Sequence, residues 1–146
     1  MYKHLLVPTD GSELSQAAVR QAAHLARELS ARILLLYVQP GYPSTIGSEV
    51  FASGSSKEEF VRQCAASADG ILARATAEVE RAEVSCKHCT AISDEPWQVI
   101  VNMAKFEDCD LIVMASHGRK GIAGLLIGSQ TQKVLTHSKI PVLVCR

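Results

Sequence analysis

The sequence has no long apolar run and no excess of charge of one sign. Its longest unbroken apolar run is 33–38, far below the roughly 18 residues that a membrane span needs. Lysine plus arginine number 15 and aspartate plus glutamate also number 15, so the net charge is zero. Proteins that bind nucleic acids or membrane surfaces usually carry a basic surface. We therefore predict a globular protein that binds neither nucleic acid nor a membrane.

Cysteine is sparse and odd in number, at five residues. The apolar stretch before Pro8 covers only 5–7, too short for a signal peptide. Reduced thiols in the cytoplasm are therefore expected. Cys86 and Cys89 have C-x-x-C spacing, but they fall within a predicted strand, where residues three apart point to opposite faces. A second such pair is missing, so we predict neither a metal site nor a redox site.

Short apolar runs alternate with longer helical patterns along the chain. The apolar runs predict five strands, at 3–8, 32–38, 83–92, 110–115 and 141–146. Helices are predicted over 12–30, from Ser55 or Ser56 to about Ala82, over 95–106 and over 129–136. Their expected amino-terminal caps are Ser12, Ser55 or Ser56, Ser93 or Asp94, and Ser129 in a capping box with Gln132.

This alternation, with strands that are apolar throughout, indicates a parallel sheet covered on both faces. We predict one doubly wound α/β domain over 1–146, with a five-stranded parallel sheet in the order 3-2-1-4-5. Such sheets bind ligands beyond the carboxyl ends of their strands, where the strand order reverses. The loops at 8–12, 39–56, 92–94 and 115–128 are therefore the candidate binding loops.

The last of these loops holds four glycines, Gly118, Gly121, Gly124 and Gly128, and leads into a helix. A helix amino terminus offers unpaired N–H groups and a partial positive charge, which suit a phosphate. Glycine lets the backbone approach phosphate oxygens closely. The pattern is neither a Walker loop nor G-x-G-x-x-G. Close approach to a ligand and ordinary turn formation both remain open explanations.

Two stretches resemble the universal stress protein family. MASHGRKGIAGLLIGSQTQKVLTHSKIPVLV (114–144) is similar to its carboxyl-terminal signature, in which nucleotide-binding members carry Gly-x-x-Gly, nine residues, then Gly-Ser or Gly-Thr. LLVPTDGSELSQAAVRQAAHLA (5–26) is similar to its first strand and helix. One position departs from the motif: Ala115 stands where its first glycine is expected. The added methyl group is compatible with the motif at negative φ, but it could narrow the ribose site.

The resemblance implies a cytoplasmic stress-response protein that binds ATP or AMP, with or without Mg²⁺. Asp10 would lie near the ribose or a phosphate-bound Mg²⁺, and the backbone of Val38 would meet the adenine edge. The implied nucleotide-binding set is Pro8, Thr9, Asp10, Val38, Ala115, Ser116, His117, Gly118, Arg119, Gly128, Ser129 and Gln130, with no protein metal ligand and no catalytic residue. The resemblance also implies a homodimer through the last strand, at 141–145.

These residues also have structural explanations. Asp10 could form an Asx turn or cap the first helix, Ser129 could cap its own helix, and Arg119 could simply be solvated. His117 could contact a phosphate or act as an acid, but no carboxylate partner is evident, and at most slow ATP hydrolysis is implied. We therefore predict no dedicated enzyme. The alternative function is a dimeric interaction protein of the same fold that binds no nucleotide.

Overall fold

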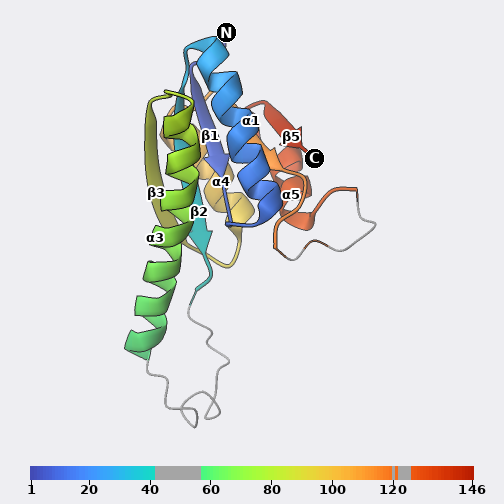
Figure 1. The fold of residues 1–146 in the computed structure, drawn as a ribbon. Coiled ribbons are helices and arrows are strands. Elements are labelled where there is room, and N and C mark those ends of the chain that lie inside the picture. The colour runs from blue at the N-terminus through green and yellow to red at the C-terminus, as the bar shows by residue number, and fades with distance from the viewer. Residues whose placement is uncertain (42–56, 120, 122–125) are drawn as a thin grey trace.

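Five parallel strands form the centre of the computed structural model, which describes residues 1–41, 57–119, 121 and 126–146 (Figure 1). The strands lie in the order β3-β2-β1-β4-β5. Every pair is parallel, which confirms the predicted fold class and strand order. The strand bounds are β1 His4–Pro8, β2 Arg32–Gln39, β3 Cys86–Ile92, β4 Leu111–Ala115 and β5 Val142–Cys145.

Helices cover both faces of the sheet, as Figure 1 shows. Helices α1 (Glu13–Leu29) and α3 (Lys57–Arg81) pack on one face and α4 (Pro96–Phe106) and α5 (Ser129–His137) on the other. Successive residues of a strand point to opposite faces, so Leu5 and Val7 enter the core beneath α1 and α3, while Leu6 enters the core beneath α4 and α5. Burial on both faces explains why the central strands are apolar throughout.

The predicted caps were right for α1 and wrong for two other helices. Ser12 caps α1 by accepting a hydrogen bond from the Ser15 N–H. The cap of α4 is Glu95, because the side chains of Ser93 and Asp94 accept hydrogen bonds from other backbone groups. The cap of α5 is Gly128, one residue before Ser129. Its carbonyl already accepts the Gln132 N–H at 2.9 Å, so Ser129 is the first residue of the helix and not its cap.

The start of β3 differs from the predicted one, and one predicted cap and most of one loop are not described by the structure. Strand β3 begins at Cys86, later than predicted, because the chain turns at Glu83 with a φ of 59° before it can pair with β2. The predicted cap at Ser55 or Ser56 and most of the loop 39–56 lie outside the described residues.

The two cysteines of the C-x-x-C sequence lie on opposite sides of β3. Cys86 packs against the core beneath α1 and α3, and Cys89 against the other core. Burial, with a smaller contribution from Glu80, raises the pKa of Cys86 to about 11, so its thiol stays protonated at neutral pH. The prediction of opposite faces is confirmed. Within the described ranges, no three His, Cys, Asp or Glu side chains are placed to share a metal ion.

No helix in the described part of the chain is both long and apolar enough to cross a lipid bilayer.

Candidate functional site

The loops after β1 and β4 meet where the strand order reverses. From β1 the chain builds the sheet outward through β2 and β3, and β4 and β5 then lie on the other side of β1. The carboxyl ends of two adjacent parallel strands therefore face the same edge, where such sheets bind ligands. Asp10 joins the two loops: its Oδ2 accepts the Arg119 N–H at 2.7 Å, and its Oδ1 accepts the Ser12 N–H at 3.0 Å.

Asp10 is held as a carboxylate by these contacts. Burial acts to raise its pKa, but hydrogen bonds from Ser12, from the Arg119 backbone and from Ser15 lower it. The resulting pKa lies below the ordinary value for an aspartate. The Asx turn predicted as an alternative is present at Oδ1. The hydrogen bond that Oδ2 accepts from Arg119 gives Asp10 a second structural role. The sequence pattern could not predict this bond, because 109 residues separate the two partners.

A side chain would overlap its neighbour at Gly118 and would be crowded at Gly128. A Cβ on Gly118 would lie 2.5 Å from Asp10 Oδ2, and one on Gly128 would lie 3.1 Å from the carbonyl oxygen of Ser116. The Gly121 N–H donates to the Gly118 carbonyl at 3.1 Å, and a Cβ on Gly121 would lie 3.1 Å from the Cβ of His117. Gly124 lies outside the described residues. Close approach therefore applies to Gly118, Gly121 and Gly128, and here the approaching groups belong to the protein itself.

The first turn of α5 is fixed to the end of β4. The Gly128 N–H donates to the Ser116 carbonyl at 2.7 Å, and Thr131 Oγ1 donates to the Ala115 carbonyl at 3.0 Å. The backbone N–H groups of Ser129, Gln130 and Thr131 have no hydrogen-bond partner in the part of the chain that the structure describes. A helix amino terminus with free donors is a ready site for an anion.

Ala115, the departure from the family motif, directs its methyl group into the core. It is 7 % exposed and belongs to the apolar cluster beneath α1 and α3. Its φ is not among the positive values of the described residues, so an alanine fits the backbone there without strain. The methyl group is therefore packed in this apolar core.

Thr9 and Gln130 use their side chains for structure. Thr9 is 5 % exposed, and its Oγ1 lies 3.0 Å from Ser15 Oγ. The side-chain Oε1 of Gln130 accepts the backbone N–H of Trp97 at 3.0 Å, which connects α5 to the start of α4. Pro8 ends β1, and Val38 lies near the end of β2 with its side chain packed on the core beneath α4.

Two side chains of the loop after β4 border the meeting point. His117 Nδ1 lies 3.1 Å from Ser116 Oγ, and His117 Nε2 is buried with no partner among the residues the structure describes. Arg119 is exposed, and its Nη2 lies 3.0 Å from where a Cβ on Gly11 would be. Its guanidinium therefore lies over the turn that leads into α1.

The sequence model of the universal stress protein family matches residues 1–146 of this chain. The chain belongs to the universal stress protein family. Universal stress protein YxiE of Bacillus subtilis is 31 % identical over 156 residues, covering all of both chains.

Solved universal stress proteins share the fold described above. The universal stress protein UspA of Lactobacillus plantarum is 27 % identical with a TM-score of 0.82, covering 99 % of this chain and 98 % of that one. A universal stress protein crystallised in complex with cAMP is 25 % identical with a TM-score of 0.68, covering 99 % of this chain and 97 % of that one.

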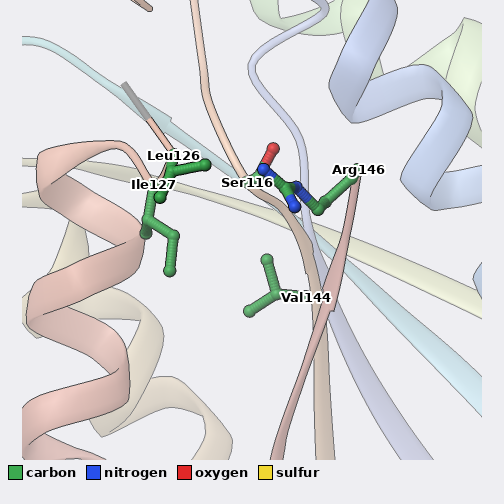
Figure 2. A pocket seen from close by; sticks show the side chains of 5 residues that line it. All are labelled: Ser116, Leu126, Ile127, Val144 and Arg146. Carbon is green, nitrogen blue, oxygen red and sulfur yellow. The ribbon is translucent and has the colours of Figure 1, made fainter. Parts of the chain in front are cut away.

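This universal stress protein also has a mainly apolar cavity of about 280 Å³ on the β5 side of Ser116. Figure 2 shows the Arg146 side chain reaching toward Ser116, with Leu126 and Ile127 on the stretch before α5 and Val144 on β5. Its walls suit an apolar group better than a phosphate. The sequence pattern did not predict this cavity, because its walls come from three separate segments.

Proposed function

We propose that this chain is a cytoplasmic stress-response protein that binds an adenine nucleotide, ATP or AMP, at the carboxyl ends of β1, β2 and β4. The observation that carries the proposal is the set of three unpartnered backbone N–H groups at Ser129, Gln130 and Thr131. They follow Gly128, whose lack of a side chain allows the helix to begin directly against the Ser116 carbonyl.

In this proposal each loop binds a different part of the nucleotide. The N–H groups of α5 and the Ser129 hydroxyl bind the phosphates, and Arg119, exposed beside them, offsets phosphate charge. A carboxylate accepts hydrogen bonds, so Asp10 binds ribose hydroxyls, or holds a Mg²⁺ ion carried by the phosphates. The backbone of Val38 meets the adenine. The relative crystallised with cAMP supports an adenine ligand for this fold.

We favour nucleotide binding without a dedicated catalytic activity. The His117 ring contacts the neighbouring Ser116 hydroxyl, and among the described residues no carboxylate is hydrogen-bonded to this imidazole. A general base is normally oriented by such a partner. Comparing ATP turnover with Mg²⁺ between the wild type and His117→Ala tests this, and we expect equal, negligible rates.

The test of nucleotide binding is to denature freshly purified protein and identify what it releases. We expect an adenine nucleotide from the wild type and little or none from Asp10→Ala. A matched control is Asp69→Ala, on the exposed surface of α3, which should release as much as the wild type. Protein that releases nothing, and that binds no adenine nucleotide when one is supplied, would contradict the proposal.

A dimeric interaction protein that binds no nucleotide is the second candidate. The observation in its favour is that the Asp10 carboxylate already occupies the Arg119 N–H, so the protein's own anion holds the loop. The same release experiment separates the two candidates.

We also propose a homodimer through β5, at 141–145. This strand forms one edge of the sheet, and Leu143 is 44 % exposed on it. Leu126, 70 % exposed, and Ile127, 39 % exposed, continue the apolar surface beside the cavity. An uncovered apolar edge strand favours pairing with a second chain.

A further inference from the structure

A polar groove lies between α1 and α3, which run side by side on one face of the sheet (Figure 1). Its cavity volume is about 240 Å³. The lining includes Glu13, Gln16 and Arg20 from α1, and Arg74, Glu78 and Arg81 from α3. These positions recur at spacings of three and four residues, so each helix turns one face toward the groove.

The positive charges of the groove are not fully balanced. Arg81 forms an ion pair with Glu78 at 3.0 Å. Arg20 and Arg74 are exposed, and neither has an ion-pair partner within 4.0 Å in the described ranges. Three guanidinium groups and two carboxylates leave the lining with a net charge of +1. The groove therefore favours one negative charge.

Gln16 adds a hydrogen-bonding group that the protein leaves unused. The residue is only 3 % exposed, and its Nε2 has no hydrogen-bond partner among the described residues. A buried donor without an acceptor destabilises the fold, and such groups are rare in native proteins. An oxygen atom brought into the groove, with rotation of this side chain, would supply the missing acceptor.

We propose that this groove binds a carboxylate group, supplied by a small organic acid or by an acidic side chain of a partner protein. The planar guanidinium groups of Arg20 and Arg74 match the two oxygens of a carboxylate, and Gln16 donates a further hydrogen bond. A single carboxylate balances the excess charge of +1, whereas a phosphate dianion would leave the occupied groove with a net charge of −1. The groove is separate from the loops that we propose for the nucleotide and does not depend on that proposal.

The experiment follows the arginine Nε–Hε signals of the 146-residue chain by NMR. The probes are sodium acetate and the peptide acetyl-Gly-Glu-Gly-amide, each compared with sodium chloride at equal ionic strength. We expect saturable shifts of the Arg20 and Arg74 signals with a carboxylate. The double variant Arg20→Gln/Arg74→Gln should bind about tenfold more weakly or worse, and Gln16→Met should also weaken binding.

The matched control is Arg27→Gln/Arg62→Gln, which removes one exposed arginine from each of the same helices outside the groove. It should bind as the wild type does. Shifts with both probes support a site for free carboxylates, and shifts with the peptide alone support a partner's side chain. Equal shifts with chloride, no shifts with either probe, or equal loss in both double variants would overturn the proposal.

Discussion

At the scale of single residues, the Asp10 carboxylate is the group that holds the loops after β1 and β4 together. It accepts the N–H groups of Ser12 and Arg119, and Gly118 leaves the space that the carboxylate needs. Any side chain at position 118 must therefore displace either Asp10 or the loop.

Gly118→Ala tests this dependence. The new Cβ would lie 2.5 Å from Asp10 Oδ2, so we expect the Arg119 bond to break and the free energy of unfolding to fall by about 1–2 kcal/mol. The pKa of Asp10, measured by NMR titration, should rise because a hydrogen bond that lowers it is lost. Gly70→Ala is the control for the Asp10 pKa, which it should leave unchanged, since a Cβ there meets nothing within 4 Å. An unchanged Asp10 pKa in Gly118→Ala would contradict this account.

His4 should make the stability depend on pH. It is 8 % exposed, and burial and the nearby Arg32 cation lower its pKa below the ordinary 6.5, against smaller opposing effects from Glu107 and Asp110. The unfolded chain then binds protons that the folded chain does not, so the free energy of unfolding should fall as the pH drops below about 6.5. Urea unfolding at several pH values measures this, and His4→Phe should have a flatter profile in that range. An equal slope in the variant would mean that other groups cause it.

At the scale of helices and strands, the attachment of α5 to β4 positions the free N–H groups. Thr131 Oγ1 donates to the Ala115 carbonyl, and Thr131 is 3 % exposed. Thr131→Val keeps the shape but leaves that carbonyl without this donor, so we expect a loss of about 1 kcal/mol in the free energy of unfolding. Thr136→Val is the control, because its hydroxyl is exposed and bonds within its own helix. Equal effects of the two substitutions in chemical denaturation would show that the attachment contributes nothing.

The order of the elements was predictable from the sequence, but several of their ends were not. Apolar strands and amphipathic helices are recognised from the spacing of apolar residues along the chain, which can be read directly from the sequence. The caps of α4 and α5 depend on contacts between distant segments: Asp94 bonds to Gly41, and Gly128 bonds to Ser116. A local rule such as the capping box cannot detect such partners.

The same distinction applies to the candidate site. The glycines and Asp10 could be selected from the sequence, because their residue types and spacing resemble a family motif. Three other features depend on packing between elements. They are the burial of the Ala115 methyl group, the hydrogen bond between the Gln130 side chain and the Trp97 backbone, and the groove between α1 and α3. They became visible only in the structure.

At the scale of the whole molecule, the exposed edge at β5 predicts self-association. Leu143→Lys places a charge on that edge and should shift the molar mass in light scattering from dimer to monomer. The control is Leu14→Lys on α1, where the leucine is 40 % exposed, compared with 44 % for Leu143. It should remain dimeric. A monomeric wild type at micromolar concentration would contradict the proposed dimer.

The central claim is that the amino terminus of α5, entered through Gly128, binds the phosphates of an adenine nucleotide. Isothermal titration calorimetry with ATP and with AMP, on protein freed of bound nucleotide, tests it most directly. Gly128→Ala would place a Cβ 3.1 Å from the Ser116 carbonyl oxygen, so one of the two must move by a few tenths of an ångström. We predict saturable heat for the wild type and for Gly70→Ala, with binding about tenfold weaker or worse for Gly128→Ala. No heat with either nucleotide, or equal affinity in all three proteins, would contradict the account.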